Sequence, residues 1–592
     1  MRIFSTGDGR PRVTALVLLG ALAIGLLLFG VFLTTGDFSG VHSLRPLPQG
    51  HNSAAPAELA PLGAPEARQS KRPNIVLLLT DDMRTDDLRF MPNVRRLIGD
   101  RGLTFRNSFS PYPLCCPARA SLLSGEYSHN HHVFSTQYPY GFRAFDDRST
   151  LGTSLNRSGY NTLFLGKYLN GYGDQNVLST GQSSFRYVPP GWTEWYGAPN
   201  RPTNSGYPIG GTYNYFHTIF NINGVTDDTH QGQYQTDVIS RMARRLIHTY
   251  HRSPKPFFMY LAPAAPHFGR PVEKDDPRHV TDPATGEQER IETPARPRWV
   301  WGHFDEQIPR ASGLPQDGGP SEADVSDKPR PMNHRPELTP HERIAVRNLT
   351  RQRAESLYVL DLQVKQLVRT LKATGEYRNT VIIFTSDNGY FLGEHRVRQG
   401  KIKPHEPSLR VPFLIEGPGI PHGQRFDPIT TPGLAATIVQ LAHARMPHPA
   451  DGLSVVPSFE RDRGWTVPVV TEGLEGFKVF HETKRQPAAG FHDPRTTIGI
   501  RTPGWKYVRY DDGDGELYDL DKDPNELHSH FGDPRYAKIQ HELARLWWEY
   551  KDCRAASCRA PMPANLQRGP HADRVDTNEQ SRGVEKRYGY FR

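Results

Sequence analysis

Two adjacent cysteines, a proline and an arginine lie close together at Cys115, Cys116, Pro117 and Arg119. Neighbouring cysteine side chains seldom have the geometry to form a disulfide bond with each other. Because Pro117 breaks a helix that starts before it, we expect a helix to begin at Ala120, with its N-terminus facing Cys115. A helix N-terminus favours anions, and the Arg119 guanidinium adds a fixed cation. The stretch indicates a thiol-derived group where an oxyanion is stabilised; the alternative is a buried thiol pair at a tight turn.

Two pairs of oxygen-bearing side chains follow apolar runs far apart in the chain. One run ends in Asp81 and Asp82, and the other ends in Asp387 and Asn388. A short apolar run of this kind indicates a buried parallel strand, and ligands bind at the carboxyl ends of such strands. Either pair alone could form a turn or a helix cap. Together they predict one site for a hard cation, calcium or magnesium rather than zinc, because every ligand atom is oxygen.

The rest of the chain up to residue 450 alternates between helical and strand patterns. This alternation predicts an α/β fold with a doubly wound, mostly parallel sheet in a main domain over residues 72–450. Residues 270–345 lack apolar periodicity, and we expect them to form an insertion that covers the site entrance. The expected helices cover residues 92–101, 233–247, 357–371 and 431–442, and the expected strands cover 163–165, 257–261 and 411–415.

A different pattern follows in residues 451–560. Short alternating segments at 497–500, 505–510 and 516–520 predict a smaller antiparallel sheet, and residues 536–549 predict a helix packed on it. Residues 561–592 are polar and aperiodic, so we expect a disordered tail.

Cys553 and Cys558 are close in sequence and are expected to close a small disulfide loop outside the cytoplasm. The alternatives are two free thiols or half of a metal site. The disulfide would leave Cys115 and Cys116 without a structural role.

The N-terminal region predicts a membrane segment and a tether. Residues 13–33 form an apolar run long enough to span a bilayer, preceded by arginines in residues 1–12. The positive flank places residues 1–12 in the cytoplasm and the globular part outside it. We expect an uncleaved signal anchor, with a cleaved signal peptide as the alternative. Residues 34–71, rich in Pro, Ala and Gly, are expected to form a linker.

Composition sets wider limits. A chain of 592 residues allows about two to four domains. The net charge of +9 is spread along the sequence, and no basic cluster with aromatic partners or known nucleic-acid-binding module is visible, so we expect no nucleic-acid partner. An anionic substrate or an anionic cell surface accounts for the charge as well, and a merely solvated surface accounts for it better still.

The nucleophile stretch resembles the signature of type I sulfatases. The register selects Cys115 rather than Cys116, because one residue separates the family's nucleophile from the proline. The resemblance implies that a formylglycine-generating enzyme oxidises Cys115 to formylglycine (3-oxoalanine), whose hydrate is the nucleophile. Ala118 stands where the family most often has Ser, and Glu126 where a basic residue is frequent. The matching positions are Cys115-x-Pro117-x-Arg119-x-x-x-Leu123-Ser124-Gly125.

The same resemblance implies roles for the other candidate residues. One calcium ion would be held by Asp81, Asp82, Asp387, Asn388 and the group derived from Cys115. Lys167, His267 and Lys401 would contact the sulfate or the leaving alcohol, where preorganised cations stabilise developing charge. Lys403 is a rival for Lys401, because this loop can shift by two residues. Leu169 stands where many sulfatases have a histidine assigned to the sulfate-releasing step, which leaves the elimination base open.

The implied reaction is hydrolysis of a sulfate ester to sulfate and an alcohol. In this family one hydroxyl of the hydrate attacks sulfur, His267 with Lys401 would assist the departing alcohol, and deprotonation of the second hydroxyl expels sulfate. The stretches at 114–117, 129–132 and 166–170 resemble the N-acetylglucosamine-6-sulfatase branch, which points to a sulfated sugar. Two alternatives remain: a phosphate or phosphonate ester hydrolase of the same alkaline-phosphatase superfamily, and an inactive sulfated-glycan-binding protein. Many of those hydrolases use two zinc ions and more often have His where this chain has Asn388. Asn388 therefore favours a site with one metal ion and a sulfate ester as substrate.

Overall fold

Continuous apolar runs form the central strands, and every residue of β1 (Asn74–Thr80) and β11 (Thr380–Ser386) is buried. The computed structural model describes residues 72–200, 210–277, 280–281, 288–289, 291–475 and 495–590. The predicted segments 1–12, 13–33 and 34–71 lie outside these residues. Within the described part of the chain, no helix is long and apolar enough to cross a membrane.

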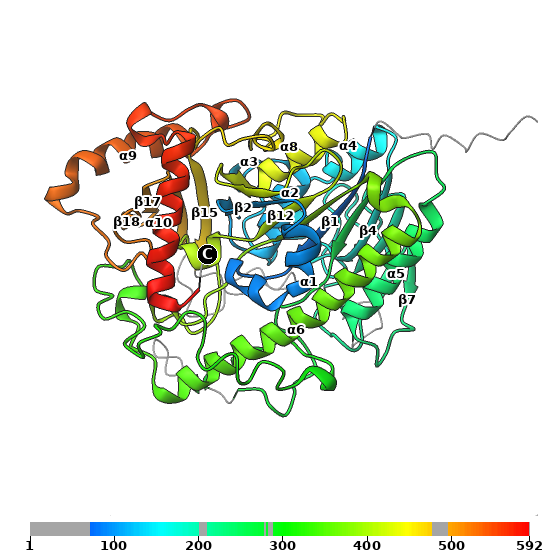
Figure 1. The fold of residues 1–592 in the computed structure, drawn as a ribbon, viewed down its shortest axis with the longest axis horizontal. Coiled ribbons are helices and arrows are strands. Elements are labelled where there is room, and N and C mark those ends of the chain that lie inside the picture. Colours follow the sequence, from blue (N-terminus) through cyan, green and yellow to red (C-terminus); the bar gives the residue numbers. More distant parts are fainter. Residues whose placement is uncertain are drawn as a thin grey trace, which may run out of the picture. The chain divides into compact units, whose positions relative to one another are not determined.

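The central sheet has ten strands, and its middle five are parallel, which confirms the predicted mostly parallel α/β sheet (Figure 1). Strand β12, expected from the 411–415 run, pairs antiparallel with β11. The strand order is β13 (Gly423–Arg425), β2 (Leu103–Phe105), β12 (Phe413–Glu416), β11, β1, β8 (Phe257–Ala262), β4 (Asn161–Lys167), β5 (Glu194–Ala198), β6 (Phe220–Ile222) and β7 (Val225–Asp227).

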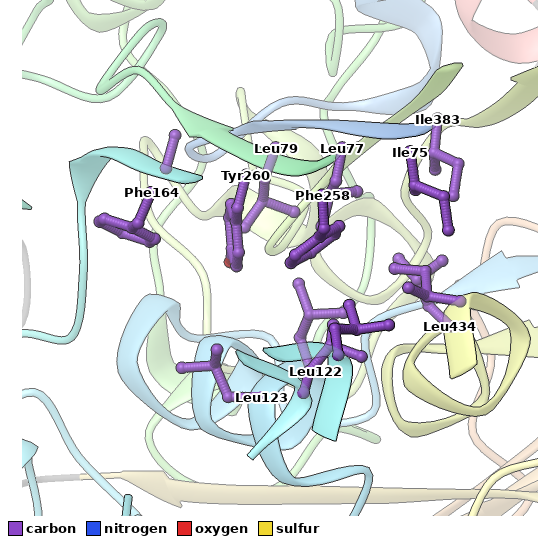
Figure 2. Close-up of a cluster of buried hydrophobic side chains, with 14 of the residues drawn as sticks. Ile75, Leu77, Leu79, Leu122, Leu123, Phe164, Phe258, Tyr260, Ile383 and Leu434 are labelled. Carbon is purple, nitrogen blue, oxygen red and sulfur yellow. The ribbon is translucent and has the colours of Figure 1, made fainter. Parts of the chain in front are cut away.

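Helices cover both faces of this sheet, as the predicted double winding requires. Successive β1 side chains alternate between two buried clusters, with Ile75, Leu77 and Leu79 on one face and Val76 and Leu78 on the other. Figure 2 shows the first cluster, in which α2 and α8 side chains pack against the strands. One face carries α2 (Cys115–Ser124), α4 (Leu151–Arg157) and α8 (Thr431–Leu441); the other carries α1 (Pro92–Val94), α5 (Gln235–Tyr250) and α6 (Pro340–Ala373).

A smaller antiparallel sheet follows, as predicted, and α9 (Ala537–Tyr550) packs against it. Its strands, in order, are β15 (Val469–Glu475), β16 (Arg495–Arg501), β17 (Trp505–Tyr510) and β18 (Gly515–Asp519). The disulfide between Cys553 and Cys558 is present, which confirms that prediction. The short elements are α3 (Ser128–His131), α7 (Glu406–Leu409), β3 (Ser108–Phe109), β9 (Val280–Thr281), β10 (Gln288–Glu289) and β14 (Ile429–Thr430).

The expectation of a disordered tail over 561–592 is wrong for the described residues, which end at 590. Residues Pro570–Tyr588 form α10, which begins with a proline in its first turn and ends at Gly589, whose φ of 78° is favourable for glycine. The helix has no apolar stripe because polar side chains make many of its contacts. Asn107 donates to Thr577 Oγ1 over 2.9 Å, and Gln580 donates to the Pro503 carbonyl over 2.9 Å. Hydrogen bonds of this kind leave no periodicity in the sequence.

The expected insertion ends earlier than predicted, because α6 begins at Pro340 with Thr339 as its cap. Part of the insertion is fixed to α6 by a buried ion cluster. Arg296 lies 2.9 Å from Glu355 of α6 and 3.2 Å from Glu273. A buried arginine with several carboxylates holds its segment in one place, since breaking a buried ion pair is costly. Coverage of the site entrance stays a prediction.

Candidate functional site

The predicted ligand pairs meet because β1 and β11 are neighbours that end level with each other. Thr80 pairs with Ser386, so Asp81–Asp82 and Asp387–Asn388 leave the sheet side by side. The Asp82 backbone N–H donates to Asp387 Oδ1 over 3.0 Å, and Asn388 Nδ2 donates to Asp82 Oδ1 over 2.8 Å. Asp82 has φ of 70°, a left-handed conformation that few residue types adopt. This sharp turn begins directly after the strand and holds the carboxylate at its end.

Cys115 is the first residue of α2, so the expectation that the helix begins at Ala120 is wrong. The first N–H groups of a helix have no partner within it, and a proline in the first turn therefore removes no helical hydrogen bond. The Cys115 Sγ atom lies 3.3 Å from Asp81 Oδ1, 3.7 Å from Asp82 Oδ1 and 2.7 Å from Lys401 Nζ. The candidate nucleophile and the ligand pairs thus occupy one site.

The Cys115 thiol is a poor nucleophile as it stands. Burial and the neighbouring Asp81 carboxylate raise its pKa well above the ordinary range, although Lys167 and Lys401 act in the opposite direction. The thiolate is the reactive form of cysteine, so a buried thiol with a raised pKa is inert near neutral pH. Unmodified cysteine is therefore unsuited to nucleophilic attack at this position.

Arg119 lies one helical turn after Cys115 and is fully buried. Its Nε donates to Asp387 Oδ2 over 2.8 Å, and its Nη1 donates to the Lys167 carbonyl over 2.8 Å. Its Nη2 makes no hydrogen bond with any described residue and lies 3.9 Å from Asp81 Oδ1. Because Nε and Nη1 are held by these bonds, the guanidinium is fixed in place and Nη2 can donate to an anionic oxygen of a ligand.

The two lysines predicted to act on the substrate both lie at the carboxylates. Lys167, the last residue of β4, donates to Asp81 Oδ2 over 2.6 Å. Burial alone would lower the pKa of Lys167, but Asp81 and the other anionic neighbours raise it, so the side chain stays charged. Lys401 pairs with Asp82 and also contacts Cys115. Its position against the candidate nucleophile favours Lys401 over Lys403.

His267 follows β8 and faces the same site. Its Nδ1 lies 2.8 Å from the Phe268 carbonyl oxygen, and its Nε2 lies 3.7 Å from Asp82 Oδ2. Burial lowers the pKa of His267 to about 4, although Asp81 and Asp82 act in the opposite direction, so the imidazole is neutral at neutral pH. Because Nδ1 faces a carbonyl, the neutral ring carries its proton there and presents Nε2 as a hydrogen-bond acceptor.

Tyr213 is part of the site, although no sequence pattern indicated it. Its ring stacks on His267 with centroids 4.4 Å apart, and Lys167 Nζ lies 5.0 Å from its centroid. Its hydroxyl accepts a hydrogen bond from Asn170 over 2.7 Å. Tyr213 lies in an irregular segment with no motif of its own. Leu169, in contrast, is packed in the apolar core, so that position supplies no base.

The oxygen atoms at the strand ends fit a hard cation. Asp82 Oδ2 and Asn388 Oδ1 are buried and accept no hydrogen bond from the described residues. Buried polar atoms are normally paired, so two such oxygens from neighbouring ligand pairs are suited to a metal ion. One ligand atom from each of Asp81, Asp82, Cys115 and His267 also lies within 4.8 Å of the others.

Two family models match this chain. The model described as Sulfatase matches residues 73–444, and the model described as N-sulphoglucosamine sulphohydrolase, C-terminal, matches residues 393–552. Between them they cover the ten-stranded sheet, the smaller sheet and every candidate site residue named above.

Curated relatives match most of the chain. An arylsulfatase of Chlamydomonas reinhardtii is 31% identical over 84% of this chain and 77% of its own length. The human N-acetylglucosamine-6-sulfatase is 29% identical over 84% of this chain and 87% of its own length. Both alignments therefore cover more than four fifths of this chain.

Solved structures share the fold. One was determined in complex with its substrate D-glucosamine-2-N,6-O-disulfate; its TM-score is 0.57 at 21% identity, over 82% of this chain and 99% of that one. The phosphonate monoester hydrolase of Agrobacterium radiobacter has a TM-score of 0.55 at 20% identity, over 84% of this chain and 99% of that one. At these identities the likeness establishes the fold alone.

Proposed function

Because this chain belongs to the sulfatase family and is a sulfuric ester hydrolase, we propose that its nucleophile is formylglycine derived from Cys115 and that its substrate is a sulfated sugar. One observation carries the proposal: Cys115 Sγ contacts both Asp81 and Lys401 at the start of a buried helix. An anionic group there would have a cation on one side and metal ligands on the other.

The raised pKa of the thiol supports conversion of Cys115. An aldehyde in its place, made by a formylglycine-generating enzyme, would supply as its hydrate two hydroxyl groups on one carbon, of which one attacks and the other allows sulfate to leave. A simple alcohol would instead be left as a stable sulfate ester. The surrounding charges need not change for this conversion, because Lys401 already contacts the side chain at position 115 and Arg119 keeps Nη2 without a hydrogen bond beside Asp81.

Asp81, Asp82, Asp387 and Asn388, with the group derived from Cys115, would hold one calcium ion. It would supply positive charge beside the nucleophile and the sulfate oxygens. The unpaired oxygens of Asp82 and Asn388 support this assignment.

The other residues divide the work of binding and proton transfer. Arg119 Nη2 would bind a sulfate oxygen, while Asp387 and the Lys167 carbonyl keep its guanidinium in place. Lys401, charged and at the nucleophile position, would donate the hydrogen bond or proton that the departing alcohol needs. His267 is neutral and presents Nε2 as an acceptor, so it is suited to a substrate hydroxyl rather than to acid catalysis on its own. Lys167 would neutralise Asp81 and orient it.

The substrate proposed is a sugar such as N-acetylglucosamine 6-sulfate. The resemblance of residues 166–170 to that branch supports it, and so does the 29% identity to the human N-acetylglucosamine-6-sulfatase. The disulfide loop and the apolar run at 13–33 support action outside the cytoplasm, membrane-anchored or secreted.

A panel of substrates tests the proposal against its phosphonate alternative, which the fold alone does not separate. We expect the matured protein to release sulfate from N-acetylglucosamine 6-sulfate and from an aryl sulfate, with kcat/KM at least about 10²-fold above that for the matching phosphonate monoester. Ion chromatography of released sulfate gives the readout. A preference for the phosphonate would contradict the proposal.

A further inference from the structure

We propose that the C-terminal helix α10 and Tyr590 form a strap that holds the metal-ligand loops in position. The strap acts through the buried side chain of Arg84, which contacts Tyr590. The inference rests on the proposed calcium site and adds residues that do not touch the metal. Tyr590 and Arg84 are thus assigned as positioning residues.

Arg84 links the two loops that carry the ligand pairs. It lies two residues after Asp82, and its Nη1 donates over 2.6 Å to the carbonyl of Tyr390, which lies two residues after Asn388. Its Nε donates to Asp86 over 2.8 Å. The side chain is only 2% exposed, so these bonds are made in a low-dielectric interior where they are strong. Arg84 therefore fixes the spacing of the two ligand loops.

Tyr590 supplies the last partner of this guanidinium. Arg84 Nη2 donates to the Tyr590 hydroxyl over 2.6 Å and lies 2.8 Å from Glu394 Oε1. The Tyr590 hydroxyl is 3.4 Å from the same Glu394 oxygen, and the other Glu394 oxygen accepts from the Leu392 N–H over 2.8 Å. The Tyr590 hydroxyl thus connects Arg84, which follows Asp82, to Glu394 in the loop that follows Asn388.

The helix α10, which ends two residues before Tyr590, is fixed at several points. Arg310 donates to the Tyr588 carbonyl over 2.7 Å, and Gln316 donates to the Lys586 carbonyl over 2.7 Å. In its middle, the helix binds Asn107 beside β3 through Thr577 and Pro503 beside β16 through Gln580. A strap attached to the segment before β3, to the smaller sheet and to the insertion can hold Tyr590 in one position. Figure 1 shows α10 running beside the smaller sheet.

The strap lies beyond the part of the chain that the family models cover. The second model ends at residue 552, and α10 begins at Pro570. Both ligand pairs lie inside the range that the Sulfatase model matches, whereas Tyr590 lies outside both matched ranges.

A conservative variant tests the strap. We expect Tyr590→Phe, which keeps the ring and removes the hydroxyl, to raise the calcium Kd about tenfold, the lower end of what loss of outer ligand support costs. The Kd is measured by calorimetric titration of calcium into metal-stripped wild-type and variant protein. Excess calcium is expected to restore the sulfatase activity of the variant.

Tyr550→Phe is the matched control. Tyr550 is also buried, and its hydroxyl donates to the Ala560 carbonyl in the C-terminal subdomain. The Tyr550→Phe variant therefore also loses one hydroxyl hydrogen bond, but away from the metal ligands. We expect this control to lower the Tm without changing the calcium Kd. Arg84→Lys keeps the charge but loses the planar fork, and we expect it to weaken calcium binding even with Tyr590 intact.

The outcomes separate this inference from the proposed function. A wild type that binds calcium and a folded Tyr590→Phe variant that binds it equally well would overturn the strap alone. A wild type that binds no calcium would overturn the metal site and the strap together. An equal loss of affinity in Tyr550→Phe would show a general stability effect and would also overturn the strap.

Discussion

The Cys115→Ala variant is expected to lose sulfate ester hydrolysis by at least about 10⁴-fold in kcat, as removal of a covalent nucleophile does elsewhere. Alanine cannot be oxidised to formylglycine, and it leaves Arg119, Lys167 and Lys401 in place. The variant should therefore still bind a sulfated product or substrate. Sulfate release measured under saturating substrate checks the first expectation, and calorimetric titration with the substrate checks the second.

Cys116→Ala is the control, because its thiol is adjacent but points elsewhere. The Cys116 Sγ donates to the Asn170 carbonyl over 3.6 Å and lies in the apolar core. We expect its kcat to stay within about threefold of wild type, since the change removes a single buried atom. Comparable loss in both variants, with both proteins folded, would remove the distinction between the two cysteines and contradict the assignment.

The second large effect is expected at Lys401. Lys401→Met removes a charge that contacts Cys115 Sγ over 2.7 Å and pairs with Asp82, while keeping the length of the side chain. We expect kcat to fall by about 10²- to 10³-fold, as loss of one preorganised donor to a developing anion does. Because the proposed donation is to the leaving alcohol, substrates with poor leaving groups should lose more than aryl sulfates. Steady-state rates with an alkyl and an aryl sulfate measure both.

Lys403→Met tests the alternative assignment, in which Lys403 rather than Lys401 acts at the site. Lys403 lies two residues further along the same loop, carries the same charge and can be changed in the same way. We expect its kcat to stay within about threefold of wild type. If Lys403→Met lost more activity than Lys401→Met, the register of this loop at the site would be wrong.

Local patterns sufficed to predict the centre of the fold and the ligand pairs. The apolar runs before Asp81 and Asp387 indicated buried strands with sites at their ends, and the two strands are neighbours in the sheet. Strand pairing brings those residues together with no further information, since both strands are parallel and end level. Buried strands that are marked by continuous apolar runs are therefore predictable from the sequence.

The sequence predicts the wrong start for α2, because the effect of a proline depends on its position in the helix. Proline disrupts the interior of a helix but is favourable in the first turn, where no intrahelical bond is lost. Pro117 occupies that first turn. Since the helix begins at Cys115 itself, the candidate nucleophile lies at the helix N-terminus rather than in front of it.

Contacts between distant segments were not predictable. Tyr213 joins the site through a ring stack on His267, and Tyr590 reaches Arg84 from the far end of the chain. Neither residue lies in a motif, and α10 makes polar contacts that give no hydrophobic period. Such contacts depend on how finished elements pack, which a single sequence does not display.

The mass of the tryptic peptide Asn107–Arg119, from protein made in its natural host, tests the central claim most directly. The claim predicts that position 115 carries an aldehyde or its hydrate in place of the thiol, while Cys116 remains an ordinary cysteine. The aldehyde should also react with a hydrazine reagent that leaves thiols unchanged. Two intact thiols in most molecules of a preparation that hydrolyses sulfate esters would contradict the formylglycine mechanism.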